Sequence, residues 1–190
     1  MRSAQPQNTQ KILRWVGMAC LAVLAAVLER NGYGRPHTSG QRPHNTQSMP
    51  VGGTVEGHPK LVDGDSFYIN GTEVRMVGID APEGKQTCER KGRSWACGEE
   101  ARRQLATLIG GRAISCKGDA PDQHGRLLGT CTVNGRNLNR DMVASGFAVS
   151  FGALYNREER EAREGGRGLW SGEFQKPRDW RHAHGIGGPR

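Results

Sequence analysis

The order of strand-like and helical segments is the feature that most limits how this chain can fold. Residues 53–71 predict two strands interrupted at the Asp-Gly-Asp of 63–65, and residues 72–79 predict a third. An amphipathic helix is expected over 98–111, followed by two more strands over 112–118 and 126–135. Five strands with a helix between the third and the fourth are typical of an OB-type Greek-key barrel. We therefore expect an α+β domain, a five-stranded β-barrel with about three helices.

Local signals place several of the expected turns and helix ends. Asn70-Gly71 predicts a tight hairpin turn between the second and third strands. A second helix is expected over 137–146, where Asn137 is a good N-cap. A third, highly charged helix is expected over 157–164, because glycines follow it closely. Residues 84–98 are polar and irregular, and we expect a loop there.

The N-terminal segment, residues 1–29, resembles an export signal. Its basic start is followed by the apolar run Trp15–Leu28. As a helix this run would span about 21 Å, which is short of a hydrocarbon core of about 30 Å. Counted from Ile12, it just reaches spanning length, so an uncleaved inner-membrane anchor over 12–28 remains an alternative. Either way, we expect an exported protein, periplasmic or secreted.

The remaining boundaries follow from composition. Residues 30–50 are rich in Gly, Pro, Ser, Asn, Gln and His and nearly free of aliphatic side chains. Such a segment cannot bury enough apolar area to offset its ordering entropy, which predicts a disordered linker. We expect the folded domain over 51–181 and a flexible tail over 182–190.

The net charge of +8 does not by itself identify a partner. The first 50 residues hold six basic and one acidic side chains, whereas the remaining residues hold 21 and 18. Most of the excess therefore lies in the leader and linker, where flanking positive charge has a targeting explanation.

Four of the five cysteines lie in the expected domain, and Cys20 lies in the apolar leader. An even number of cysteines behind an export signal predicts two disulfides. Three pairings are possible, and we favour the two that close short loops, which are Cys88–Cys97 and Cys116–Cys131. The spacings contain no Cys-x-x-Cys, which disfavours a zinc site.

Charged side chains gather where the expected strands end. They are Asp63, Asp65, Arg75, Asp80, Glu83, Asp122 and Arg126. Taken singly, each has an ordinary explanation as a turn or surface residue. Arg75 and Asp80 lie five residues apart, so a regular strand would point them to opposite faces. Gly78 between them could host a bend that turns the strand exit and lets these groups converge.

Several separated motifs together resemble the thermonuclease (staphylococcal-nuclease-like) family. The first is VDGDSFYINGTEVRMVGIDAPE, with its Asp-Gly-Asp, its strand arginine and its Asp-x-Pro-Glu. Downstream motifs agree in order: the Gly-Arg of HGRLLGTC, then LNRDMVASGFA, then GLWSGEFQKPRDWR. The resemblance covers residues 53–181. It implies an OB-fold nuclease that uses calcium to hydrolyse phosphodiester bonds of DNA and/or RNA with low sequence specificity.

The resemblance also implies a role for each matching residue. Asp65 and Asp80 would bind Ca²⁺ together with the backbone carbonyl of Ala81, and Asp63 would stand behind them. Glu83 would be the general base that activates water, and Arg75 and Arg126 would grip the phosphate. The residue types suit these roles, since calcium prefers oxygen ligands and guanidinium groups bind phosphate oxygens in pairs.

Two other functions remain open at this point: a nucleic-acid-binding OB module without catalysis, and a disulfide-stapled interaction domain. The complete set of Arg75, Asp80, Glu83 and Arg126 favours the nuclease, because a binding module has no need of it. Tyr155 either stacks on a nucleobase or packs a helix, and both are open. We expect a monomer whose partner is its nucleic-acid substrate, with membrane attachment through the N-terminal segment as an open alternative.

Overall fold

The computed structural model describes residues 53–186. These residues all belong to one compact unit of the chain, Gln47–Arg190. The predicted leader over 1–29 and linker over 30–50 lie outside the described residues. Between residues 53 and 186, no helix is both long and apolar enough to cross a membrane.

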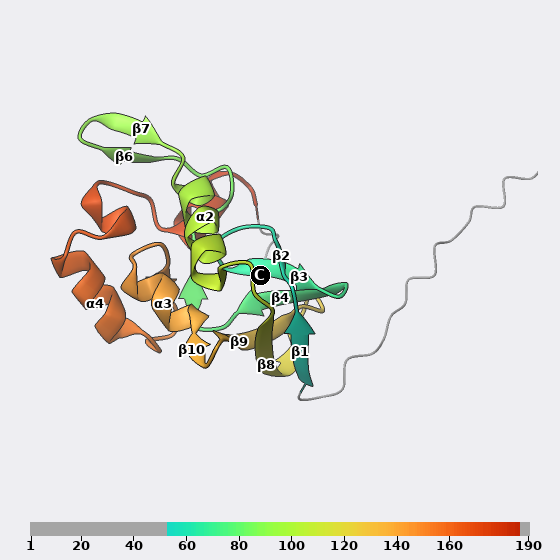
Figure 1. Ribbon diagram of the computed structural model, residues 1–190. Helices are drawn as coiled ribbons and strands as arrows, with labels where there is room; N and C mark the ends of the chain where they lie inside the picture. The colour runs from blue at the N-terminus through green and yellow to red at the C-terminus, as the bar shows by residue number, and fades with distance from the viewer. Residues whose placement is uncertain (1–52, 187–190) are drawn as a thin grey trace, which may run out of the picture. The chain divides into compact units, whose positions relative to one another are not determined.

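The core of the domain is a curled sheet in the order β1-β8-β9-β4-β3-β2 (Figure 1). These strands are β1 (Gly53–Gly57), β2 (Lys60–Leu61), β3 (Ser66–Ile69), β4 (Thr72–Met76), β8 (Ile114–Pro121) and β9 (Leu127–Val133). The two ends of the order, β1 and β2, are consecutive in the chain and are separated only by His58-Pro59. Proline cannot donate a ladder hydrogen bond, so one long strand is broken there and serves both edges of the sheet. Counting β1 and β2 as one strand gives the five-stranded OB-type barrel that the sequence predicts, with α2 between its third and fourth strands.

Pairing within the barrel follows the predicted turns. The β3–β4 hairpin turns at Asn70-Gly71, where both residues have positive φ (49° and 85°), as a two-residue hairpin turn requires. β4 and β9 are parallel, and Val74 pairs with Leu127. The buried side chains of these strands, among them Phe67, Val74 and Leu127, alternate with more exposed ones and fill the barrel interior.

Four α-helices and one 3-10 helix lie within residues 53–186. They are α2 (Cys97–Ile109), α3 (Leu138–Ala144), α4 (Asn156–Glu164), η1 (Gly168–Ser171) and α5 (Pro177–Ala183). In Figure 1, α2, α3 and α4 gather on one side of the curled sheet. The Asn137 side chain caps α3 by accepting a hydrogen bond from the Arg140 amide at 2.9 Å. The first three α-helices match the sequence prediction, whereas α5 was not predicted and extends two residues beyond the expected boundary at 181.

The expected loop over 84–98 instead contains a hairpin, which corrects the sequence prediction. Strands β6 (Cys88–Arg90) and β7 (Arg93–Trp95) pair across Lys91-Gly92, both with positive φ. Each strand has only three residues, too few to show an alternation of polar and apolar side chains. The hairpin projects away from the sheet (Figure 1). Three further two-residue strands, β5 (Ile79–Asp80), β10 (Arg136–Asn137) and β11 (Val149–Ser150), complete the fold.

Both predicted disulfides are present. Cys88–Cys97 joins β6 to the first residue of α2. Cys116 and Cys131 are directly opposed in the β8–β9 ladder and are bridged there. The second bridge lies in the main core, and the first belongs to a smaller cluster with Leu169, Trp95 and Phe174.

Candidate active site

The exit of β4 bends back on itself, and this bend brings Asp80 to Arg75. Gly78 has a φ of 77°, and a side chain at this position would meet Leu154 and Tyr155. After the bend, β5 pairs with β11, which holds Asp80 opposite Val149. The Asp80 Oδ1 atom accepts a hydrogen bond from Arg75 Nη2 at 3.0 Å. The convergence that the sequence left open is therefore present.

The Asp-Gly-Asp turn presents Asp65 to the same arginine. Asp63 Oδ1 accepts hydrogen bonds from the amides of Asp65 (3.0 Å) and Ser66 (2.8 Å) and from Ser66 Oγ (2.6 Å), which fixes the turn. Gly64 is required because an added Cβ would lie only 2.8 Å from Cβ of Ala81 and 2.9 Å from Cβ of Ala101. Asp63 thus stabilises the turn, whereas the Asp65 carboxylate contacts Ala81, the residue that follows β5.

Asp65 is the most deeply buried charge of the site. Its Oδ2 atom accepts hydrogen bonds from the Ala81 amide at 3.0 Å and from Arg75 Nη2 at 3.3 Å. Its side chain is 2% exposed, against 20% for Arg75. Burial raises the pKa of the Asp65 carboxyl well above its ordinary value, although the positive charge of Arg75 acts in the opposite direction. The nearby Asp65 charge in turn raises the pKa of Arg75.

Glu83 lies on a loop whose backbone is pinned by Gln86. The backbone amide of Gln86 donates to the backbone carbonyl of Glu83 at 2.8 Å. The fully buried side chain of Gln86 donates through Nε2 to the backbone carbonyl of Gln175 at 2.7 Å. At the start of α2, a Cβ on Gly98 would collide with the Glu83 carbonyl oxygen, so helix and loop are in direct contact. No role for Gln86 was predicted. Its place three residues after Glu83 suits a turn, but its partner is 89 residues away.

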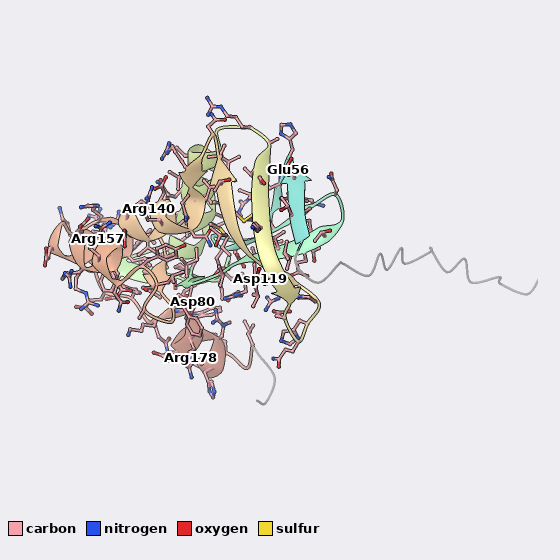
Figure 2. The ribbon with its side chains drawn as sticks, turned by 90° about the horizontal axis from the view of Figure 1, so that it is seen from below. Glu56, Asp80, Asp119, Arg140, Arg157 and Arg178 are labelled. Carbon is pink, nitrogen blue, oxygen red and sulfur yellow. A yellow bond between two sulfur atoms is a disulfide. The ribbon has the colours of Figure 1, made fainter. Side chains whose placement is uncertain are left out.

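Arg181 in α5 is the residue of the site that the sequence did not reveal. Its Nη1 atom donates to Asp80 Oδ1 at 2.9 Å and to Glu83 Oε1 at 2.8 Å, and its Nη2 atom donates to Asp80 Oδ2 at 3.2 Å. Figure 2 shows Asp80 on the side of the domain where α5, marked by Arg178, lies. Burial opposes the charged form, but the hydrogen bonds to both carboxylates raise the pKa of Arg181 above its ordinary value. The only sequence signal for Arg181 was its place in the motif GLWSGEFQKPRDWR, which carries part of the family resemblance.

Arg126, the second predicted phosphate ligand, is held by a different carboxylate. It stands immediately before β9, and its Nε and Nη2 atoms donate to Asp122 Oδ2 at 2.9 and 2.7 Å. Partial burial acts in the opposite direction, but these hydrogen bonds and those from the Arg126 and His124 amides lower the pKa of Asp122. No hydrogen bond or ion pair joins Arg126 to Asp65, Asp80 or Glu83 within residues 53–186.

Tyr155, the predicted stacking residue, is 8% exposed and belongs to the main core. Its ring lies beside the Gly78 bend, which favours the packing role over base stacking. The exposed aromatic side chain of the same segment is Phe151, at 55%. Its amide donates to the Gly78 carbonyl at 2.9 Å, so it stands next to the strand exit that carries Asp80.

Comparison with known proteins agrees with this arrangement. Residues 73–172, more than half of the chain, match the sequence profile of the family described as "Staphylococcal nuclease homologue". The chain belongs to this family. The resemblance drawn from the motifs and the OB-type barrel with helices are thereby confirmed.

This staphylococcal nuclease homologue has relatives of different lengths. It is 33% identical over 123 residues to the succinoglycan biosynthesis protein ExoI of Rhizobium meliloti (strain 1021), covering 61% of this chain and 64% of that protein. It is 39% identical over 123 residues to the probable staphylococcal-like nuclease CAN2 of Oryza sativa subsp. japonica, covering 62% and 31%. An uncharacterized endonuclease of Escherichia coli O157:H7 is 31% identical over 135 residues, covering 65% and 82%. The chain thus spans less than two thirds of ExoI and about a third of CAN2.

The residues of this staphylococcal nuclease homologue fit a calcium ion through two carboxylates. No group of three His, Cys, Asp or Glu side chains suited to a metal exists within residues 53–186. Asp65 and Asp80 nevertheless both reach one nitrogen of Arg75, so their oxygens already share a cation. Two carboxylates, a backbone carbonyl and water are the oxygen ligands that calcium accepts. The buried Asp65 carboxylate would also gain most from a second positive charge nearby.

Proposed function

We propose that this protein is a calcium-dependent nuclease, an endonuclease that hydrolyses phosphodiester bonds of DNA and/or RNA with low sequence specificity. The observation that carries the proposal is the convergence of Arg75, Asp65, Asp80 and Glu83 at one end of the barrel. Family membership supports it, as do relatives whose names describe nucleases. A binding module would have no use for two buried carboxylates beside a partly buried arginine, because the arrangement costs stability without contacting bases.

In the proposed reaction, Asp65, Asp80 and the carbonyl of Ala81 would hold the calcium ion, and Asp63 keeps the Asp-Gly-Asp turn in place. Bound calcium would supply positive charge where the phosphate gains negative charge. Glu83 accepts a proton from water, and the water oxygen forms a bond to phosphorus. The ester P–O bond breaks, the leaving oxygen takes up a proton from solvent water, and Glu83 gives its proton back to solvent.

Arg75 and Arg126 have the task of stabilising charge on the nonbridging oxygens. Guanidinium groups suit it because their N–H groups form paired hydrogen bonds with phosphate oxygens. Arg75 is already oriented by Asp65 and Asp80, and Arg126 by Asp122. Nη1 of Arg126 has no partner among residues 53–186 and would be the group that reaches the substrate.

For localisation, we propose export through the N-terminal segment, with the protein periplasmic, secreted or anchored by residues 12–28. The nucleic-acid-binding module without catalysis is the second candidate function. Its support is the fold alone, since OB barrels commonly bind oligonucleotides.

Cleavage by the purified full-length chain, kept in mild detergent, tests the function. Single-stranded DNA and RNA would be incubated with Ca²⁺ or with EGTA, using wild type, Glu83→Gln and the control Glu89→Gln. Glu89 is an exposed acid of β6 near the same loop. We expect cleavage only with calcium, a loss of about 10²–10⁴-fold in Glu83→Gln, and an unchanged control.

Other outcomes would change the assignment. Cleavage in EGTA, or a fully active Glu83→Gln, would show that the roles of calcium and Glu83 are wrong. Nucleic-acid binding without cleavage under any divalent ion would favour the binding module.

A further inference from the structure

Arg181 occupies the acceptor atoms that a metal ion would need. Both oxygens of Asp80 accept hydrogen bonds from Arg181, and Oδ1 also accepts one from Arg75. A carboxylate has about four lone-pair sites, so three of them are in use. Arg181 is also the only hydrogen-bond or ion-pair partner of the Glu83 carboxylate within residues 53–186.

Charge explains why a guanidinium is held there. Asp65, Asp80 and Glu83 share the two cations Arg75 and Arg181. Without Arg181, the nearly buried Asp80 would lose its bidentate partner, and Glu83 would lose the cation that draws it toward Asp80. Unpaired charges in such places are costly, so some cation must stand between these two carboxylates.

The helix that delivers Arg181 is lightly attached to the domain. Of the seven residues of α5, only Pro177 is buried. Within residues 53–186, Arg181 is the one side chain of α5 that forms a hydrogen bond or ion pair with another element. The segment just before the helix is firmly anchored, since Glu173 pairs with Glu89 through backbone hydrogen bonds and the Gln175 carbonyl is held by Gln86. If the contacts of Arg181 were broken, α5 would be free to move about this anchor.

We propose that Arg181 is an intramolecular cation that competes with calcium for Asp80, and that calcium binding releases α5 from the site. This inference rests on the proposed calcium site. A divalent ion and a guanidinium repel each other and need the same Asp80 oxygens, so each bound state disfavours the other. Because coupling is reciprocal, loosening Arg181 tightens calcium binding by the same factor by which calcium loosens Arg181.

Calcium affinity and amide hydrogen exchange test the competition in the full-length protein. Isothermal titration would compare wild type with Arg181→Gln, which removes the charge, and with Arg178→Gln, an exposed arginine of the same helix. We expect Arg181→Gln to bind calcium about tenfold more tightly, because charge-assisted hydrogen bonds no longer have to be broken. Arg178→Gln should stay within about twofold of wild type, since an exposed charge at a distance is screened. In wild type, calcium should speed exchange of the amides of residues 177–186.

A third variant separates direct competition from a general charge effect. Arg181→Lys keeps the charge but cannot form the bidentate contact, so we expect it to bind calcium about threefold more tightly than wild type. An affinity equal to that of wild type would favour a purely long-range effect and overturn the competition. If Arg181→Gln fails to fold, the exchange of wild type with and without calcium still decides the question.

Different results would overturn the competition between Arg181 and calcium and the proposed function. Equal calcium affinities in wild type and Arg181→Gln, with calcium-dependent cleavage intact, overturn only the competition. Slower exchange of 177–186 on adding calcium also overturns it. If neither protein binds calcium, the calcium site of the proposed function fails as well.

Discussion

Arg75 on β4 and Arg126 just before β9, the strand paired with β4, have guanidinium groups that are held in different ways. Arg75 lies in β4 and contacts Asp65, from the turn before β3, and Asp80, from β5. Arg126 immediately precedes β9, the parallel partner of β4, and contacts Asp122, four residues earlier in the same turn. The first arginine is oriented by the tertiary fold, whereas the second is oriented by a local pair.

The carboxylates paired with the two arginines also differ in burial, and so the two arginines differ in their importance for stability. Asp65 and Asp80 are almost fully buried, with side chains 2% and 5% exposed, so removal of Arg75 leaves charges that water cannot reach. Asp122 is more accessible, at 13%, and its other oxygen serves the turn rather than the arginine. We infer that Arg75 supports both the fold and the proposed chemistry, and that Arg126 supports the chemistry alone.

Substitution of Arg75 and of Arg126 by alanine should separate their contributions to stability and to activity, and it gives the largest expected effect. Arg75→Ala should lower activity by about 10³-fold. It should also lower the free energy of unfolding by about 3–5 kcal/mol, since a buried ion pair loses one partner. Arg126→Ala should lower activity by about 10²-fold and lower the free energy of unfolding by at most about 1 kcal/mol. Initial cleavage rates and urea unfolding measure the two quantities, and equal losses of stability would contradict the comparison.

Asp122→Asn gives an intermediate effect and tests whether the local pair orients Arg126. Asparagine keeps an oxygen for the amides of His124 and Arg126, which donate to Asp122 Oδ1, but it loses the charged Oδ2 that holds the guanidinium. We expect cleavage to slow about tenfold with a stability change below about 1 kcal/mol. Asp119→Asn, at an exposed acid of β8, is the matched control. Unchanged cleavage in Asp122→Asn would mean that substrate alone orients Arg126.

The same contrast between local and distant contacts explains what could be predicted from the sequence. The Asn70-Gly71 turn, α2 and both disulfides follow from nearby residues, and all are present. The convergence of Arg75 and Asp80, which are separated by five positions, needed only the Gly78 bend.

What the sequence missed depends on contacts between distant residues. Arg181 meets Asp80 across 101 positions of the chain, and Gln86 meets Gln175 across 89. The helix that carries Arg181 has seven residues and buries only one of them, so it shows no apolar stripe from which its position could be inferred. The β6–β7 hairpin likewise has strands of three residues, and its turn residues, Lys91-Gly92, are not a typical hairpin pair.

The smallest expected effect concerns the cost of burying Asp65 beside Arg75. Burial raises the pKa of Asp65 in the folded protein above the unfolded value of about 3.9. The folded state therefore favours the protonated carboxyl. The stability linked to that proton is fully present below the unfolded pKa and is lost as pH rises through the folded pKa. At neutral pH and without metal, the ionised Asp65 should thus weaken the fold.

Asp65→Asn should therefore raise the melting temperature of the metal-free protein by several degrees at pH 7, and this gain should vanish toward pH 3. Thermal unfolding in EGTA across that range measures it. Asp63→Ala is the contrasting variant, because Asp63 accepts three hydrogen bonds in its turn, and its loss should lower stability by about 1–3 kcal/mol. A melting temperature of Asp65→Asn below that of wild type at pH 7 would mean that Arg75 and the Ala81 amide outweigh burial. The Asp65 end of the site would then be stable without a metal. The Asp65–Arg75 and Asp122–Arg126 pairs would then differ in their location in the fold, and not in whether the buried carboxylate destabilises it.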